Sequence, residues 1–127
     1  MPIVRVDIPQ GHPDSTKDGL IADIRAAIDR IIDPAQQERF PETRKWIYVA
    51  VREAHGKLGA GLPTVTIDTR PGRKAEQKIA LARAICDIFE RRLGTRDVYV
   101  LLRPTPAEDH FGGGVPLPKW MPAEQEA

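Results

Sequence analysis

The chain has 127 residues, which is enough for one compact domain with a hydrophobic core. Nineteen Lys and Arg residues against eighteen Asp and Glu residues give a net charge of +1, so the sequence lacks the clustered cations that nucleic-acid binding requires. It has no apolar run of membrane-spanning length, no signal-peptide pattern, and a single cysteine, Cys86, that cannot form an internal disulfide. We therefore expect a cytoplasmic protein with neither nucleic-acid nor membrane partners.

The first residues after Met1 predict a β-strand that is led by a proline. Residues 3–8 alternate apolar residues on one face with mixed residues on the other. If Met1 is removed, Pro2 becomes a free secondary amine, a base that ordinary residues supply only at a prolyl N-terminus. The strand would hold this amine in place against a pocket. In the alternative interpretation, Pro2 only fixes φ and lacks an N–H donor.

A helix and a second strand follow. Residues 9–11 break the first strand, a polar residue at 14–16 can cap a helix, and Asp33-Pro34 ends it. The predicted apolar stripe of this helix is Leu20, Ile24, Ile28 and Ile31, widened by Ile21 and Ile32. An apolar strand at 46–51 completes a parallel β-α-β unit with a right-handed crossover.

The same order of elements then starts again. Pro63 leads a strand at 63–68, and Pro71-Gly72 breaks it. A helix at 74–93 is followed by Gly94, which is placed to end it in the left-handed conformation. Its predicted core residues are Leu81, Ile85, Ile88 and Phe89, with Cys86 as a small core residue beside them. A strand at 98–102 completes the second unit.

These two units form an internal duplication with an offset of 61 residues, since Pro63 and Gly72 repeat the positions of Pro2 and Gly11. The expected fold is α/β (α+β), with one four-stranded mixed sheet and both helices on one face. The whole chain, 1–127, is expected to be a single domain: repeat one at about 2–61, repeat two at about 63–118, and a C-terminal tail at 119–127. The other sheet face would be apolar and exposed, which predicts a homo-oligomer.

The repeats resemble the tautomerase superfamily, whose simplest member, 4-oxalocrotonate tautomerase, is similar to one repeat. That family has a proline start, a β-α-β path, a Gly-Arg pair after the first strand and a late His-Phe-Gly-x-Gly-Gly stretch. Repeat one keeps Pro2 but has Gly11-His12 in place of Gly-Arg. Repeat two has Gly72-Arg73 and the stretch at 110–114, one residue short, while its proline is internal. The two repeats have thus divided the family's parts between them over residues 2–118.

Fused two-repeat members of this superfamily include malonate semialdehyde decarboxylase and cis-3-chloroacrylic acid dehalogenase. The resemblance places Arg70 and Arg73 as their arginine pair. It also suggests Glu38, within 34–40, as the decarboxylase's acid/base residue, with one residue inserted and Glu in place of Asp. The dehalogenase's histidine on the first helix corresponds to Asp29 here and is missing. Its late glutamate has no clean match, and the nearest candidates are Glu108, Asp109 and His110.

The chemistry of these residues supports proton transfer on a small carboxylic acid. Two guanidinium groups and partial burial would lower the Pro2 pKa, and Arg70 and Arg73 would also bind the substrate carboxylate. A neutral Pro2 is a general base for keto–enol tautomerisation. A protonated Pro2 is a general acid which, with water activated by Glu38, suits decarboxylation, hydration or dehalogenation. Further substrate contacts are expected from His110, Phe111 and Arg103.

The sequence therefore predicts a homotrimeric tautomerase or isomerase of small keto–enol acids that needs no cofactor and no metal. Its only other partner would be the small-molecule carboxylate substrate. Decarboxylation or hydrolytic dehalogenation of three-carbon acids stays open as the alternative chemistry. So does a different class, a catalytically silent oligomeric binding protein in which retained Met1 blocks Pro2.

Overall fold

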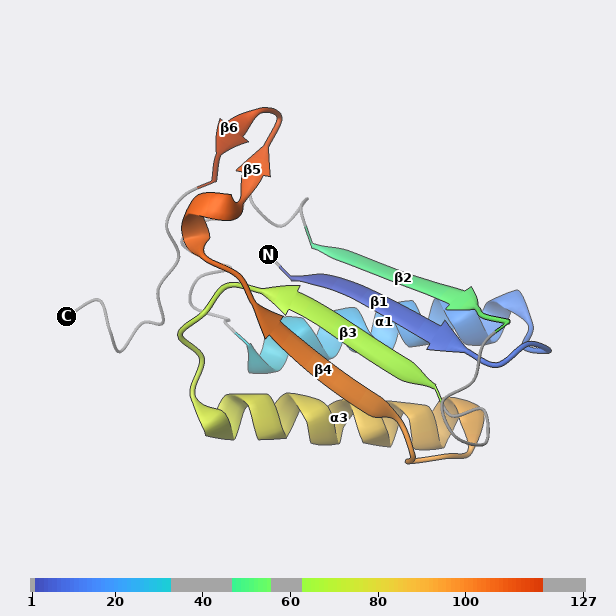
Figure 1. Ribbon diagram of the computed structural model, residues 1–127. Helices are drawn as coiled ribbons and strands as arrows, with labels where there is room; N and C mark the ends of the chain where they lie inside the picture. The colour runs from blue at the N-terminus through green and yellow to red at the C-terminus, as the bar shows by residue number, and fades with distance from the viewer. Residues whose placement is uncertain (1, 33–46, 56–62, 118–127) are drawn as a thin grey trace.

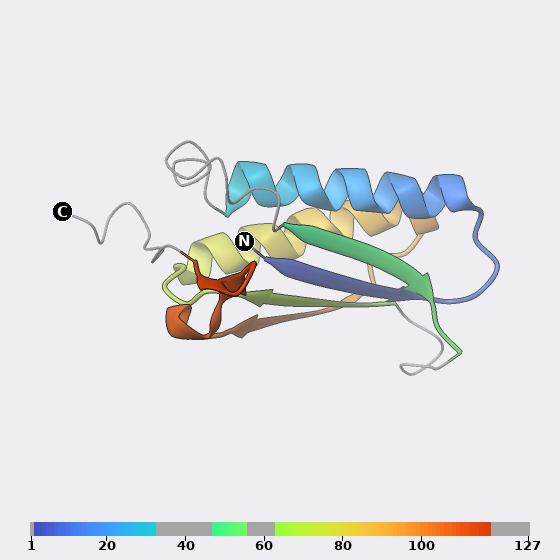
Figure 2. The ribbon, with the colours of Figure 1, turned by 90° about the horizontal axis from the view of Figure 1, so that it is seen from above.

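The computed structural model of the chain describes residues 2–32, 47–55 and 63–117. The elements in chain order are β1 (Ile3–Ile8), α1 (Asp14–Ile31), β2 (Tyr48–Glu53), β3 (Thr64–Thr69), α3 (Ala75–Leu93), β4 (Tyr99–Pro104), the 3-10 turn η2 (Ala107–Asp109), β5 (Phe111–Gly112) and β6 (Val115–Pro116). Four strands form one sheet in the order β2-β1-β3-β4, and β5 and β6 form a separate hairpin. Figures 1 and 2 show α1 and α3 side by side on one face of the sheet. The predicted α/β architecture is confirmed.

The sheet is built from two parallel pairs joined by one antiparallel pair. The strands β1 and β2 are parallel, as are β3 and β4, whereas β1 and β3 run antiparallel at the centre. Each parallel pair belongs to one repeat and is connected through that repeat's helix. The strands β1 and β3 therefore finish at opposite ends of the sheet (Figure 1). The start of β1 lies beside the finish of β3, which brings the N-terminal residues next to repeat two.

The backbone confirms the internal duplication. The elements β1 and α1 precede β3 and α3 by 61 positions, as the sequence predicts. The second strands, which start at Tyr48 and Tyr99, are only 51 positions apart because repeat one has a longer connection after its helix. Gly11 and Gly72 have φ angles of 104° and 105°. A positive φ of this size favours glycine, so both repeats use the same turn after their first strand.

The core lies between the sheet and the two helices. The predicted helix residues are buried in both repeats, although Ile21 and Ile31 are only partly buried. Cys86 is half-buried rather than a core residue. The buried cluster consists of Val4, Val6, Ile8, Leu20, Ile24, Ala27, Ile28, Ile32, Val65, Ile67, Leu81, Ile85, Ile88 and Phe89. Removing these side chains from water is the main force that holds helices to sheet. No helix in the described part of the chain is long and apolar enough to cross a membrane.

Several element boundaries differ from those that the sequence predicts. The predicted strand at 46–51 is displaced, since β2 extends to Glu53, and the strand predicted at 98–102 extends to Pro104. Each of these strands pairs with its parallel neighbour along that neighbour's full length. The pairing therefore extends both strands into polar residues that local sequence preference would leave outside a strand. The predicted side-chain cap at 14–16 is wrong, because α1 follows Pro13 with no side-chain cap. The left-handed Gly94, with φ 77°, is as predicted.

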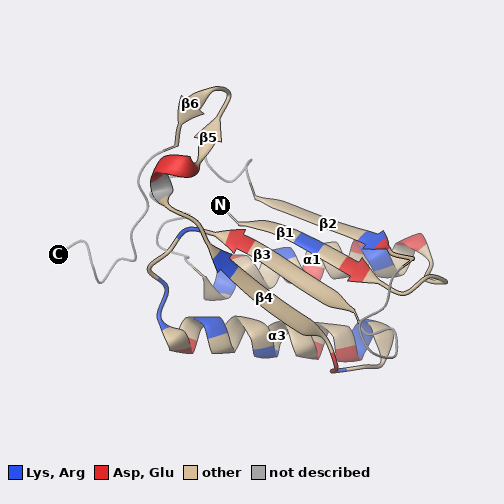
Figure 3. Cartoon of the chain, in the orientation of Figure 1, with Lys and Arg blue, Asp and Glu red and all other residues tan. Residues whose placement is uncertain are grey.

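The sheet face that points away from the helices is more polar than expected. Large apolar side chains do lie on it, with Tyr48 and Tyr99 more than half exposed. Charged positions nevertheless occur along the strands (Figure 3). Asp7 pairs with Arg52 on this face, and Asp68 pairs with Arg103 at the corresponding place in repeat two. We call this the open face; it combines aromatic residues with paired charges.

Candidate active site

Pro2 immediately precedes β1, and it is buried. Its carbonyl oxygen accepts a hydrogen bond from the Tyr48 N–H at 3.2 Å, so the pairing with β2 fixes its position. In the antiparallel register, Ile3 lies opposite Asp68, and one further step places Pro2 opposite Thr69. Pro2 therefore lies at the end of the sheet where β3 finishes.

Arg70 and Arg73 follow β3 directly and are buried despite their charge. Their exposed fractions are 2% for Arg70 and 8% for Arg73. Gly72 turns the chain between them, and Arg73 Nη1 donates a hydrogen bond to the Arg70 carbonyl oxygen at 2.8 Å. Burial lowers the pKa of the Arg70 guanidinium, yet such a group stays protonated at physiological pH. Two permanent positive charges are thus fixed at the same end of the sheet as Pro2.

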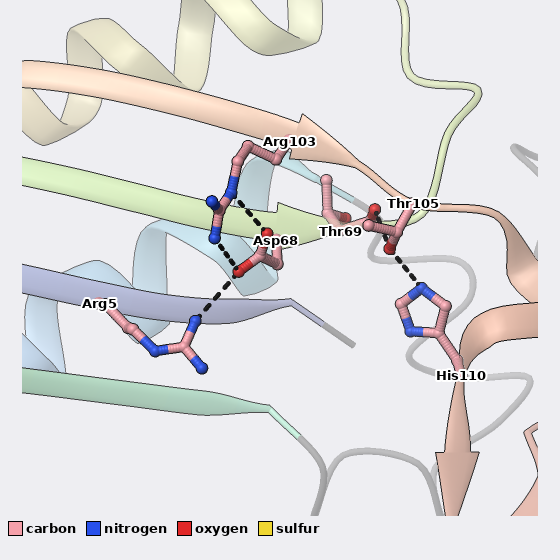
Figure 4. A network of polar contacts seen from close by, with 6 residues as sticks. All are labelled: Arg5, Asp68, Thr69, Arg103, Thr105 and His110. Atoms are coloured by element: carbon pink, nitrogen blue, oxygen red, sulfur yellow. Dashed lines mark hydrogen bonds and ion pairs between the residues drawn. The ribbon is translucent and has the colours of Figure 1, made fainter.

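A hydroxyl and an imidazole complete this end of the sheet (Figure 4). Thr105, just after β4, donates to the Thr69 carbonyl oxygen from its N–H at 2.7 Å and from its hydroxyl at 3.2 Å. The same Thr105 oxygen lies 2.6 Å from His110 Nε2. The Thr105 hydroxyl and the His110 imidazole therefore share a hydrogen bond, whose direction depends on which ring nitrogen carries the proton.

His110 is held in its neutral form by its surroundings. Burial is the largest cause that lowers the pKa of its imidazole, and the positive charge of Arg70 lowers it further. The predicted site residues Pro2, Arg70, Arg73 and His110 are therefore gathered at one end of the sheet. A cluster with two guanidinium groups and a neutral imidazole suits an anionic substrate.

The remaining predicted residues do not join this cluster in the structure. Glu38 lies outside the described residues. Phe111 begins β5, where its side chain is 61% exposed. Glu108 and Asp109, the other late candidates, are exposed on η2. The hairpin of β5 and β6 itself was not anticipated from the sequence.

Arg103 points to the open face and contacts a carboxylate of the protein itself (Figure 4). Its Nε and Nη2 donate to the two carboxylate oxygens of Asp68 at 2.8 and 2.9 Å. Arg5 Nη1 reaches the same carboxylate at 3.0 Å. The hydrogen bond from Arg103 is the largest cause that lowers the pKa of Asp68. The guanidinium predicted to hold a substrate carboxylate thus holds Asp68.

The sequence analysis did not identify Thr69 and Thr105 as residues of the candidate site. The N–H of Ala54 donates to the Ile8 carbonyl oxygen at 3.0 Å, as the N–H of Thr105 does to Thr69. These backbone contacts show that Ile8 and Ala54 are the counterparts of Thr69 and Thr105 in repeat one. Both hydroxyls are therefore confined to repeat two. The sequence signal that could have identified them is the difference between the repeats, since the matching positions of repeat one are the apolar residues Ile8 and Ala54.

No protein-family model matches the chain, and no curated protein matches it. Among solved structures, native fused 4-OT is 27% identical, with a TM-score of 0.70 over 88% of this chain and 93% of that one. Malonate semialdehyde decarboxylase is 21% identical (TM-score 0.65; 88% and 92% covered). Pt0534 inactivated by 2-oxo-3-pentynoate is 20% identical (TM-score 0.71; 90% and 95% covered). These neighbours are tautomerase-superfamily enzymes. The chain has the fold of the tautomerase superfamily, in the fused form with two β-α-β repeats in one polypeptide.

Proposed function

We propose that the protein is a cytoplasmic, cofactor-free tautomerase or isomerase of small 2-oxo and 2-hydroxy carboxylic acids, with Pro2 as its general base. The observation that carries the proposal is the meeting of Pro2 with two buried arginines at one end of the sheet. A buried guanidinium is costly to keep, so two of them beside a potential N-terminal amine favour a functional role over a structural one.

The arginines explain how the Pro2 amine acts as a base. An ordinary α-amine has a pKa of about 7.7–8.0, and proline's secondary amine is more basic. Burial and the charges of Arg70 and Arg73 both disfavour its protonated form and populate the neutral amine. The neutral amine takes the proton from the enol hydroxyl of the substrate and then returns it to carbon. The guanidinium groups bind the carboxylate and stabilise the negative charge that develops on oxygen.

A second candidate uses the same residues with Pro2 protonated. Pro2 would then be a general acid, and Glu38 would activate water for decarboxylation, hydration or dehalogenation of three-carbon acids. The fold shared with malonate semialdehyde decarboxylase supports keeping this candidate. A protein that retains Met1 would have neither activity, because Pro2 would then be an amide, and it would act as an oligomeric binding protein.

We also propose a homotrimer. A fused 4-OT that is 27% identical is a symmetric trimer, and it covers 87% of this chain with a TM-score of 0.69. The exposed Tyr48, Tyr99 and Leu101 on the open face give a trimer interface apolar surface to bury. Sedimentation equilibrium tests this proposal, and a monomeric mass contradicts it.

The test of the enzymatic proposal is the ketonisation of 2-hydroxymuconate, followed by ultraviolet absorbance. The protein is first checked by intact mass, since a mass that includes Met1 rules out an N-terminal base. Fast turnover by protein without Met1 supports the tautomerase. If there is no turnover, but malonate semialdehyde or 3-haloacrylate is consumed, the second candidate is correct.

A further inference from the structure

A buried hydroxyl at the end of β3 has no hydrogen-bond partner among the described residues. It belongs to Thr69, which is 4% exposed, and its Oγ1 is fully enclosed. Burying a hydroxyl without a partner costs free energy, because the group gives up its hydrogen bonds to water. Buried polar groups are nearly always paired. The stability of the fold therefore does not explain a hydroxyl at this position.

The counterpart of Thr69 in repeat one carries no hydroxyl. Ile8 occupies the corresponding place at the end of β1, 61 positions earlier, and it is 2% exposed. Threonine and isoleucine are both β-branched and both suit a strand, so either residue can pack there. The fold accepts an apolar side chain at this position. Only repeat two, which also holds the two buried arginines, has a hydroxyl instead.

The strand register places Thr69 directly across from Pro2. The Pro2 carbonyl accepts the N–H of Tyr48 on one side, and the Thr69 carbonyl accepts the N–H of Thr105 on the other. The backbone polar groups of Pro2 and Thr69 therefore point away from each other, which makes the two residues a non-hydrogen-bonded antiparallel pair. Side chains are closest in such a pair, with Cβ atoms about 4.5–5.5 Å apart.

The two side chains also lie on the same face of the sheet. Pro2 is buried two residues before the buried Val4, and Thr69 is buried two residues after the buried Ile67. Alternate residues of a strand share a face, so the proline ring and the hydroxyl both lie on the helix side. The backbone at Thr69 is held by Thr105, whose N–H donates to it at 2.7 Å (Figure 4). The hydroxyl is thus fixed within reach of the Pro2 nitrogen.

We propose that the Thr69 hydroxyl is the hydrogen-bond partner of the Pro2 amine, which makes Thr69 a positioning residue for the general base. While Met1 is attached, the Pro2 nitrogen is a tertiary amide with no proton to donate. Loss of Met1 gives a neutral amine with one N–H and one lone pair. Thr69 Oγ1 accepts that N–H, so the lone pair is directed to the substrate. This proposal rests on the proposed function and names the group that orients its base.

The hydrogen bond has a defined effect on the basicity of Pro2. Charged and titratable groups reach this end of the sheet from several elements: Arg25, Arg70, Arg73, Asp109 and His110. The guanidinium groups disfavour the protonated amine. A hydrogen bond from the amine to Thr69 is stronger when the amine is charged, so it favours the protonated form. Thr69 therefore limits how far the arginines lower the pKa of Pro2.

The test is a ¹⁵N NMR titration of protein made with ¹⁵N-labelled proline, in which intact mass confirms the loss of Met1. Of the 12 prolines, only Pro2 then has an amine nitrogen, so its signal is separate from those of the amides. Thr69→Val removes the hydroxyl and should lower the pKa of the Pro2 amine by about 0.5–1. It should also lower kcat/KM for 2-hydroxymuconate about tenfold, because the lone pair loses its fixed direction. Thr69→Ser should restore both values.

Thr66→Val is the matched control. Thr66 lies on the same strand as Thr69, but its side chain is on the opposite face of the sheet. This variant should leave the pKa of Pro2 unchanged and kcat/KM within about threefold. An unchanged pKa of Pro2 in Thr69→Val, equal effects of the two valine variants, or no recovery in Thr69→Ser would overturn the proposal.

Failure of the hydrogen bond and failure of the enzymatic function can be told apart. If the pKa of Pro2 falls in Thr69→Val and recovers in Thr69→Ser, but no protein turns over 2-hydroxymuconate, the hydrogen bond stands and the tautomerase is wrong. If Thr69→Val keeps both the pKa and the turnover of the unmodified protein, the hydrogen bond is wrong and the tautomerase stands. The ¹⁵N titration needs no substrate, so the two readouts are independent.

Discussion

Replacing Pro2 with alanine should remove most of the turnover while leaving the sheet intact. General acid–base catalysis by one positioned group contributes about 10²- to 10⁴-fold to a rate, so a loss of kcat in this range is expected. The loss is not complete, because alanine still supplies a primary amine at the N-terminus. The carbonyl of residue 2 keeps its hydrogen bond from Tyr48, which is a backbone contact.

The stability cost follows from the burial of the ring. Alanine lacks two ring carbons of this buried proline, and about 0.8 kcal/mol per buried CH₂ gives about 1.6 kcal/mol. A domain with a free energy of unfolding of about 5–15 kcal/mol tolerates this loss. Urea unfolding curves should therefore show a lower midpoint for Pro2→Ala with a single cooperative transition.

Pro63 offers a matched control within the same molecule. It leads β3 as Pro2 leads β1, it is buried, and its carbonyl accepts the Tyr99 N–H at 3.0 Å. Pro63→Ala loses the same ring carbons without touching a terminal amine. It should lose similar stability but keep kcat with 2-hydroxymuconate within about threefold, an effect under 1 kcal/mol. Equal losses of kcat in both variants, or full activity in Pro2→Ala, would refute the assignment of Pro2 as the base.

Three other predictions address the charged groups. Arg73→Ala should lower kcat and raise KM, so that kcat/KM falls by about tenfold to hundredfold. The control variant Arg83→Ala, on the exposed surface of α3, should leave both constants unchanged. Equal effects of the two variants would remove Arg73 from the site. The pKa of His110 is lowered in the folded protein, so the unfolded state binds its proton more tightly. Its stabilising contribution is complete above about pH 6.5 and is lost as the pH falls below that value. His110→Asn should therefore make the free energy of unfolding depend less on pH below about pH 6.5, and an unchanged slope would contradict this. Asp68→Asn should lower the free energy of unfolding, measured with urea, by about 1 kcal/mol, because it breaks the contacts to two partly exposed arginines. The control variant Asp97→Asn should lower it by less than half as much. Equal decreases would show that the open-face ion pairs do not stabilise the protein.

Local sequence patterns determined the elements and their duplication. Period-2 alternation in residues 3–8 and the apolar stripe of α3 identify their buried faces because pleat and helix periodicity act over a few residues. Gly11 and Gly72 mark the turns because few other residues adopt a φ near 105°. The pairing of Pro2 with Arg70 and Arg73 as candidates came from the order of motifs in the two repeats.

The tertiary structure decided what these residues touch. Only the antiparallel register of β1 and β3 places Pro2 opposite Thr69, and only the fold buries Arg70 to 2% exposure. The sequence does not indicate that Arg103 turns to Asp68 on the open face. These contacts join residues 35 or more positions apart, so no local pattern encodes them.

The ends of the two outer strands show the same division. Glu53 and Pro104 are each ordinary residues at the end of a strand, and neither carries a recognisable motif. Strand register places Glu53 opposite Ile8, where its carboxylate contacts the Gly11 N–H and Lys17, and places Pro104 opposite Thr69. The sequence by itself determined that the fold is duplicated. Which polar contacts each half makes depends on side chains that meet only after the strands have paired.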